Sequence, residues 1–358
     1  MLVLAACLGQ TNFGDDDSGS SDDGGPSNDG GGGPDAPQSN DGGNPATDSG
    51  GPGGPTAPNG YYTSGNTIYD SNNKAHLFHG LDRPSLEWSA NGDNLSPQDY
   101  QNMAAWKANV VRISLDQDFW LSTAPQYSSG YEALVDQQVT EAEGDGLDVI
   151  LDLHWSDRGD YETPAQQAMA DQHSVTFWQQ VATKYKGDGR VMFELYNEPQ
   201  QISWDVWLSG GSTNGFTAVG MQDLYNAVRG TGAENLVFIG GIDWAYDLSG
   251  VPGHLVNGHN IVYVTHPYNQ GGKQPNDWDS GFGFLTASYP VMATEFGDTT
   301  GCGTSYYSTL IPYMDSHHMS WSGWAWYVSG CGFPSVINDW SGTPSASGQV
   351  EKTALASY

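Results

Sequence analysis

The sequence predicts an α/β fold, a (β/α)8 or TIM barrel that begins with a short N-terminal β-hairpin and follows a disordered tether. Short apolar, β-branched runs recur eight times between residues 75 and 327. Several of them are almost continuously apolar, which is typical of parallel strands buried on both faces. Helical patterns lie between these runs, and eight such repeats favour a closed barrel over an open doubly wound sheet.

The first 60 residues differ in composition from the rest. Residues 14–60 are mainly Gly, Pro, Asp, Ser and Asn without Lys or Arg, so we expect a disordered linker. Within residues 1–13, Leu4-Ala5-Ala6-Cys7 resembles a bacterial lipobox, although the preceding stretch is short and uncharged for a signal peptide. We therefore expect a secreted or cell-surface lipoprotein attached to a membrane through a lipid on Cys7. An ordinary disordered N-terminus is the alternative.

Residues 61–358 have the composition of one folded catalytic domain. A turn at residues 71–73 predicts a hairpin of residues 61–70 and 74–78. The barrel strands are expected at residues 75–81, 109–115, 148–154, 191–197, 235–240, 261–266, 290–295 and 320–327. Helices are expected at residues 96–108, 132–143, 172–186, 217–229 and 305–318, the first with Ser96 as N-cap and Pro97 as its first residue. The Gly-rich connections 241–260 and 268–289 carry no clear helical pattern.

Charge and cysteine content restrict the partners. The chain has 42 acidic and 11 basic residues, a net charge of −31, which disfavours nucleic acid and acidic polysaccharides and leaves a neutral polar partner. Of three cysteines, Cys302 and Cys331 remain once Cys7 is assigned to a lipid. Both lie beside glycines in loop-like sequence, so we expect a disulfide, with two free thiols as the alternative.

Polar and aromatic residues collect where the predicted strands end. In a barrel of this type the chemistry lies at the C-terminal ends of the strands. Those ends carry Arg112, Asp152, His154, Trp155, Asn197, Glu198, His266, Tyr268, Glu295, Trp324 and Trp326. Glu198 and Glu295 follow opposite strands, and a pair of carboxyl groups is what glycoside hydrolysis requires. Adjacent Asn197 and Glu198 could both face this site only if the strand end is irregular.

Six motifs in order resemble glycoside hydrolase family 5, the cellulase-type retaining enzymes of clan A. They are Asn109-Val-Val-Arg112, Asp152-Leu-His154, Asn197-Glu198-Pro199, His266-Pro-Tyr268, Thr294-Glu295-Phe-Gly297 and the Trp-rich eighth strand. The resemblance covers nearly all of residues 61–358. It implies Glu198 as acid/base and Glu295 as nucleophile, oriented and kept ionised by Arg112 and Tyr268. It also implies that Asn197 binds the sugar 2-hydroxyl, His154 and His266 line the subsite, and Trp326 or Trp324 forms its floor.

The expected activity is retaining endo-hydrolysis of a neutral β-linked polysaccharide. Cellulose-like β-1,4-glucan is the first choice, with β-mannan or mixed-linkage glucan as alternatives and a non-catalytic carbohydrate-binding barrel as the least favoured. The acid should have a raised pKa, and the carboxyl separation should be about 5–5.5 Å. No cluster has the spacing of a zinc site, so we expect no metal and no cofactor, and we expect a monomer.

Several other side chains were assigned from their positions along the chain. Glu194 should be a buried, hydrogen-bonded carboxyl group, because it precedes Glu198 by four residues on the same strand. Among the tryptophans in loops, Trp155 is the first candidate for stacking on a sugar, followed by Trp204 or Trp207. Trp106 and Trp178 lie in helical patterns and are expected in the core.

Overall fold

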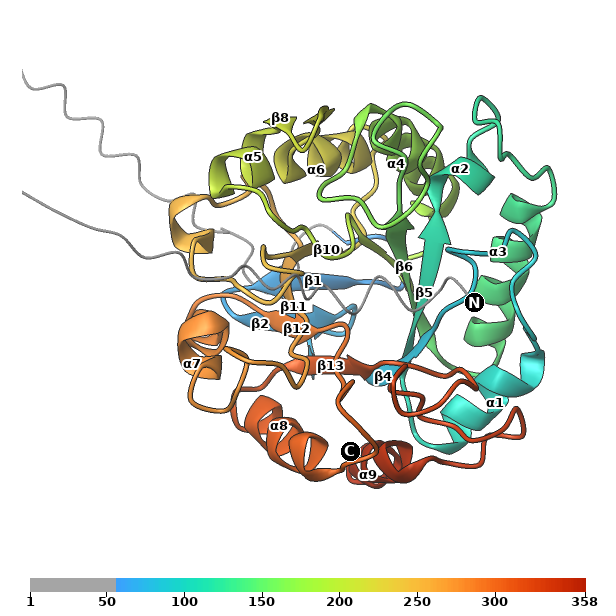
Figure 1. Cartoon of the computed structure of the whole chain (residues 1–358), viewed down its shortest axis with the longest axis vertical. Helices are drawn as coiled ribbons and strands as arrows, with labels where there is room; N and C mark the ends of the chain where they lie inside the picture. The colour runs from blue at the N-terminus through green and yellow to red at the C-terminus, as the bar shows by residue number, and fades with distance from the viewer. Residues whose placement is uncertain (1–55) are drawn as a thin grey trace, which may run out of the picture. The chain divides into compact units, whose positions relative to one another are not determined.

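The computed structural model describes residues 56–358 (Figure 1). The expectations for the lipobox at Cys7 and for the linker up to residue 55 concern residues outside this range. Within it, no helix combines the length and the hydrophobicity needed to cross a bilayer.

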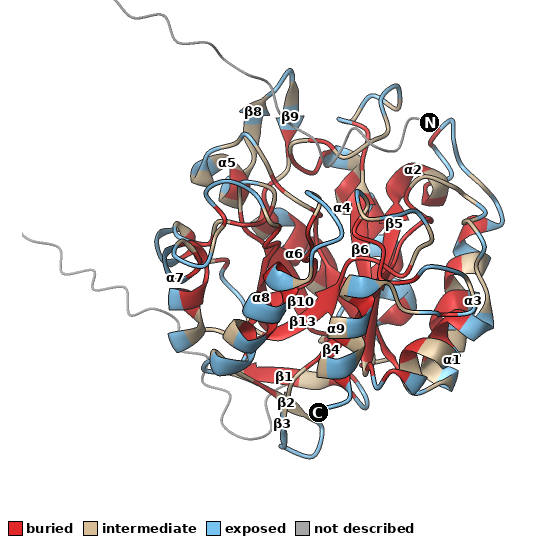
Figure 2. Cartoon of the chain, turned by 60° about the horizontal axis from the view of Figure 1, so that its bottom comes forward, coloured by how far each residue is buried: buried red, intermediate tan, exposed pale blue. Residues whose placement is uncertain are grey.

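Eight parallel strands form a closed barrel, which confirms the predicted fold. They are β4 (His79–Arg83), β5 (Val110–Asp116), β6 (Asp148–Trp155), β7 (Val191–Glu194), β10 (Val237–Gly240), β11 (Ile261–Thr265), β12 (Val291–Ala293) and β13 (Ser320–Gly323). The barrel closes where β13 pairs with β4, in a register that places Trp321 opposite His79. Apolar side chains such as Val110, Ile150 and Met292 form a separate, fully buried cluster. The barrel strands are accordingly buried except at Trp155, the last residue of β6, and exposed residues lie mainly on helices, loops and the outer hairpins (Figure 2).

Helices surround the strands (Figure 1). They are α1 (Pro97–Ala105), α2 (Gln117–Trp120), α3 (Tyr131–Gly144), α4 (Gln172–Tyr185), α5 (Trp204–Ser209), α6 (Met221–Arg229), α7 (Trp278–Gly281), α8 (Ser305–Ser316) and α9 (Ala346–Leu355), with 3-10 turns at Val251–Gly253 and Gly283–Ala287. The predicted cap of α1 is present, because the Ser96 side chain accepts a hydrogen bond from the Gln98 amide. The fifth connection contains only the short turn at Val251–Gly253, in keeping with its weak pattern.

The predicted N-terminal hairpin is a three-stranded antiparallel sheet, β1 (Tyr61–Ser64), β2 (Thr67–Asp70) and β3 (Ala75–His76). The first barrel strand, predicted at residues 75–81, therefore starts and ends later than expected. The first residues of the predicted range pair with β2, and the barrel begins at His79. The turn is fixed by the Asp70 carboxylate, which accepts hydrogen bonds from the amides of Asn72 and Lys74.

The helix predicted at residues 217–229 starts later than expected. Phe216–Ala218 forms β9, which pairs with β8 (Gly211–Thr213), and α6 begins only after Gly220. The first residues of the predicted helix therefore pair with β8 in a hairpin instead of joining α6.

Cys302 and Cys331 form the expected disulfide, with Cα atoms 5.1 Å apart, so they are not two free thiols. Cys302 lies in the loop that follows β12, and Cys331 lies in the loop that follows β13. The bond therefore joins two neighbouring loops at the C-terminal end of the barrel.

Replacing both Cys302 and Cys331 by alanine should destabilise the domain. The bond closes a loop across a separation of 29 residues, which in the chain-entropy description corresponds to about 3.5 kcal/mol of stability. Urea unfolding under oxidising conditions measures this loss. A reducing agent should lower the stability of the original chain and leave the double variant unchanged. Equal stability of the two proteins under oxidising conditions would contradict this account.

Candidate active site

The two candidate carboxylates lie on irregular backbone just beyond two strand ends. β7 ends at Glu194 and β12 at Ala293, both earlier than predicted. Glu198 has a φ of 49°, in the left-handed region that residues with a side chain seldom adopt. This break in strand alternation directs both Asn197 and Glu198 toward the same group of side chains. The irregular strand end that the sequence required is therefore present.

Glu198 and Glu295 lie close together around His266. One oxygen of each carboxylate and a ring nitrogen of His266 all lie within 4.8 Å of one another. Nδ1 of His266 is 3.2 Å from Oε1 of Glu198 and 3.7 Å from Oε2 of Glu295. The Glu198 side chain keeps 12% of its surface exposed and that of Glu295 4%, so the pair is almost completely enclosed by protein.

Glu295 is held by two hydrogen-bond donors. Nη1 of Arg112 donates to Oε1 at 2.6 Å, and the hydroxyl group of Tyr268 donates to Oε2 at 2.7 Å. Each carboxylate oxygen thus has its own donor: Tyr268 follows β11, the neighbour of β12, whereas Arg112 reaches across the barrel from β5. The carboxylate is fixed in orientation, as the resemblance implied for these two residues.

Arg112 stands at the centre of a buried cluster of acids. Its guanidinium lies 2.9 Å from carboxylate oxygens of Glu194 and of Asp152, and 3.7 Å from Asp82, in addition to Glu295. Glu194 is fully buried, as expected. Burial alone would raise its pKa, but the charge of Arg112 and the nearby His266 outweigh burial and lower that pKa to about 2.

Burial has the opposite outcome for the other two acids. It raises the pKa of Asp82 and of Asp152 well above the ordinary range, and the charge of Arg112 only partly offsets it. A single guanidinium cannot neutralise four buried carboxylates. The raised pKa values mean that protonation of Asp82 and Asp152 relieves the excess negative charge.

His154, Asn197 and Trp324 lie next to one another on one side of the site. Nδ1 of His154 is 2.7 Å from Oδ2 of Asp152, and its Nε2 is 3.3 Å from the side-chain amide of Asn197. The ring of Trp324 stacks on that of His154 with centroids 5.6 Å apart. Asn197 is fixed in turn by Nη2 of Arg112, which donates to its Oδ1 at 2.8 Å.

Trp326 is not at the site, which corrects its assignment as the aromatic floor. Its side chain is fully buried, donates to Asp99 and packs edge-on against Trp106. β13 ends at Gly323, so strand alternation no longer applies to the residues that follow. The other aromatic candidate, Trp324, takes the position beside His154.

The tryptophans of the loops divide between core and surface. Trp207 is fully buried and donates to the carbonyl of Gly240, so it is a core residue and cannot stack on a sugar. Trp155 and Trp204 are half-buried, and their role in binding stays a prediction. Trp106 and Trp178 lie in the core, as expected.

Two residues at the site were missed by sequence reasoning. The side-chain amide of Gln166 donates a hydrogen bond to Oε2 of Glu198. Gln166 lies in the irregular loop 156–171, where no periodic pattern indicates which residues point inward. Asp82 was missed because the first strand was placed several residues too early.

The charge distribution around His266 differs from what was expected. Burial lowers the pKa of His266, but the charges of Glu295, Glu194 and Glu198 outweigh it and raise that pKa to about 10. Burial raises the pKa of Glu198, yet the adjacent His266 more than offsets this and the net pKa is lowered. The raised pKa that was expected for Glu198 is therefore found for His266 instead.

His266 should make the stability of the domain depend on alkaline pH. Its pKa rises from an ordinary 6.5 to about 10 on folding, so the folded state binds the extra proton between these values. The free energy of unfolding should fall as pH rises through this window, by up to about 1.4 kcal/mol per pH unit. Urea unfolding of the original chain and of His266→Gln from pH 6 to 10 measures the contribution. Parallel pH profiles for the two proteins would disprove it.

Known proteins resemble this chain in sequence. Endoglucanase MaCel5A of Microbulbifer sp. (strain ALW1) is 25% identical over 279 residues, which is 74% of this chain and 50% of that protein. Endoglucanase E-5 of Thermobifida fusca is 25% identical over 273 residues, which is 70% of this chain and 54% of that protein. The chain thus spans about half the length of these curated relatives.

The fold is also shared with solved structures. The native form of β-glucanase SdGluc5_26A from Saccharophagus degradans superposes with a TM-score of 0.69 at 23% identity, covering 83% of this chain and 93% of that one. The family model for cellulase (glycosyl hydrolase family 5) matches residues 69–330. The chain belongs to glycosyl hydrolase family 5.

Proposed function

We propose that this protein is a retaining endo-glycoside hydrolase in which Glu295 is the nucleophile and Glu198 the acid/base. The observation that carries the proposal is the approach of their carboxylate oxygens to within 4.8 Å. Retaining enzymes hold the two carboxyl groups about 5–5.5 Å apart, whereas inverting enzymes leave about 6.5–9.5 Å for a water molecule. The spacing here supports direct attack by a carboxylate.

In the first step, an oxygen of Glu295 bonds to the anomeric carbon while the bond to the leaving sugar breaks. Arg112 and Tyr268 aim that carboxylate, and Glu198 delivers a proton to the departing oxygen. Because His266 holds a proton beside Glu198, the acid proton belongs to the Glu198–His266 pair. Substrate binding, which removes the remaining solvent, would move it onto the carboxylate.

In the second step, the glycosylated Glu295 no longer carries a negative charge. Glu198, now deprotonated, takes a proton from a water molecule, and the resulting hydroxide attacks the anomeric carbon and releases the sugar. Two inversions at that carbon give net retention. Trp324 and Asn197, which both lie next to His154, would hold the sugar bound to Glu295.

We infer that the substrate is a neutral β-1,4-glucan. The curated relatives are named endoglucanases, and structures of two family neighbours, from S. degradans and T. fusca, were solved with cellotetraose. The net charge of −31 opposes binding of acidic polysaccharides. β-Mannan and mixed-linkage glucan stay as alternatives on the same scaffold. We also propose secretion, a lipid anchor at Cys7 and a monomeric state.

Alanine variants with azide rescue test the two roles separately. Glu295→Ala should lose on the order of 10⁴-fold or more in kcat, and Glu198→Ala about 10²–10⁴-fold, the usual contribution of a general acid. With an aryl cellobioside bearing a good leaving group, azide should give an α-glycosyl azide with Glu295→Ala and a β-glycosyl azide with Glu198→Ala. If the two variants gave the opposite products, Glu295 would be the acid/base and Glu198 the nucleophile.

The substrate class is tested by initial rates on a panel of polysaccharides. Carboxymethyl-cellulose, lichenan, mannan and xylan are compared, with Glu295→Ala as the control for contaminating activity. The highest rate is expected on carboxymethyl-cellulose. Preference for mannan or lichenan would favour the alternatives, and absence of turnover on all four would favour a binding barrel.

The two candidate tryptophans give opposite expectations. The indole N–H of Trp324 is buried and has no hydrogen-bond partner in the described structure, and we propose that a sugar hydroxyl accepts its hydrogen bond. Trp324→Phe should raise KM several-fold and leave thermal stability nearly unchanged. Trp326→Ala should instead lower the free energy of unfolding by about 3–5 kcal/mol, because it empties a core site. Equal effects on KM would contradict the placement of Trp326 away from the substrate.

A further inference from the structure

Four aspartates gather where the loop 156–171 leaves β6 and enters α4. Asp157 lies near the start of this loop, and Asp171 ends it as the N-cap of α4. Asp116 ends β5, and Asp118 lies in α2. All four are at most 1% exposed. None of them belongs to the group formed by Glu198, His266 and Glu295.

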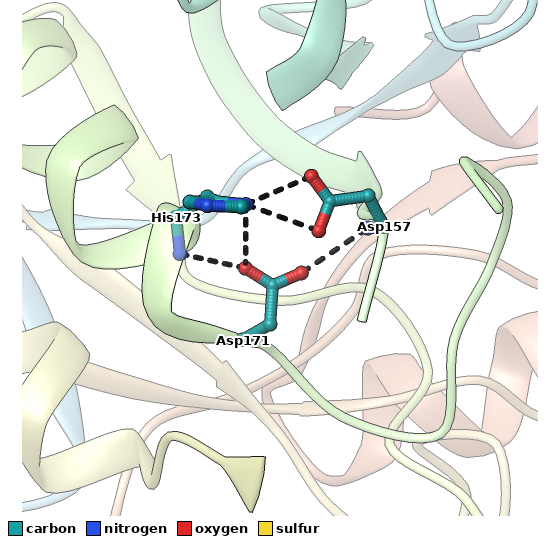
Figure 3. Close-up of side chains that lie close together, drawn as sticks. All are labelled: Asp157, Asp171 and His173. Carbon is teal, nitrogen blue, oxygen red and sulfur yellow. Dashed lines mark hydrogen bonds and ion pairs between the residues drawn. The ribbon is translucent and has the colours of Figure 1, made fainter. Parts of the chain in front are cut away.

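His173 completes this cluster (Figure 3). Its Nδ1 lies 2.9 and 3.1 Å from the two oxygens of Asp157 and 3.9 Å from Oδ1 of Asp171. One donor atom from each of these three residues lies within 4.8 Å of the other two. Ligands on opposite sides of a divalent ion, with bonds of about 2.1–2.5 Å, lie about 4–5 Å apart. The spacing therefore suits a single ion.

The cluster has little basic character around it, and its other hydrogen-bond donors are the Gln117 amide, which bonds both oxygens of Asp171, and backbone N–H groups. In residues 56–358, no Lys or Arg forms an ion pair with any of the four aspartates, and the imidazole of His173 is their one ionic partner. Buried carboxylates are costly unless they are paired, protonated or bound to a cation. The cluster thus differs from the active site, where Arg112 lies among the acids.

Asp118 points into the cluster without a partner of its own. Its carboxyl group faces that of Asp157, and neither of its oxygens has a hydrogen-bond donor among the described residues. A bound cation would satisfy these oxygens, and a proton shared with Asp157 is the competing explanation.

We propose that Asp118, Asp157, Asp171 and His173 bind one divalent cation of the Mn²⁺ type. Carboxylate ligands suit Mg²⁺, Ca²⁺ and Mn²⁺, whereas imidazole suits the transition metals, so Mn²⁺ accepts both kinds. On binding, Nδ1 of His173 exchanges its proton for the metal, and the proton leaves to solvent. The imidazole side chain is 18% exposed, which gives the ion a route from solvent.

The position of the site suggests what the ion would do. It would connect both ends of the loop 156–171 to α2. The same loop carries Gln166, whose amide donates to the carboxylate of Glu198. Backbone hydrogen bonds between Ser156 and Ala165 already join the start of the loop to the residue before Gln166. The ion would therefore stabilise the domain and keep Gln166 in place, without contacting the substrate.

The test is a titration of the full chain with Mn²⁺ after dialysis against a chelator. Loss of the electron paramagnetic resonance signal of free Mn²⁺ should report one bound ion per chain, and the thermal midpoint should rise with Mn²⁺ concentration. Asp118→Asn should abolish both effects. Asp160→Asn, a change at an exposed acid of the same loop, is the matched control and should keep them.

Two further comparisons separate the alternatives. Glu198→Gln should still bind the ion, and loss of binding there would place the ion in the active site and overturn the proposal. If the original chain binds no Mn²⁺ and its midpoint does not move, the proposal is wrong and the shared proton explains Asp118. Since this measurement needs no substitution, it decides the question even if Asp118→Asn fails to fold.

Discussion

The geometry of the site depends on the guanidinium of Arg112. It contacts Glu295, Glu194, Asp152 and Asn197 at 2.6–2.9 Å, and so fixes the nucleophile candidate and the residue beside Glu198 with one planar group. Arginine suits this task because its donors form a rigid fork and it keeps its charge when buried. A lysine could not reach the same set of acceptors in fixed directions.

His266 is the centre of a second network of charged and polar side chains. The imidazole of His266 contacts both Glu198 and Thr294. Thr294 donates a hydrogen bond to Glu194, and Glu194 accepts another from Arg112. The two carboxylates are therefore linked through one continuous network. Charge introduced at one of them is felt at the other, as the proposed double displacement would require if Glu295 is glycosylated and Glu198 changes from acid to base.

The sequence predicted most of this site because polar residues interrupt apolar strands at their ends. His154, Glu198, His266, Tyr268 and Glu295 lie at or just beyond strand ends, whereas Arg112 lies inside β5, and the structure brings them together. Period-two alternation could not separate Trp324 from Trp326, since both lie beyond the end of β13. It also gave no information on Gln166, because the position of a side chain in an irregular loop is set by long-range contacts.

The closure of the barrel has a consequence for how the chain is made. The seam joins β4 to β13, whose paired residues His79 and Trp321 lie far apart in the sequence. During synthesis the N-terminal strands emerge first, so β4 keeps an open edge until most of the domain has left the ribosome. Open strand edges recruit other chains. Nascent or interrupted chains would therefore need protection by chaperones until the last strand arrives.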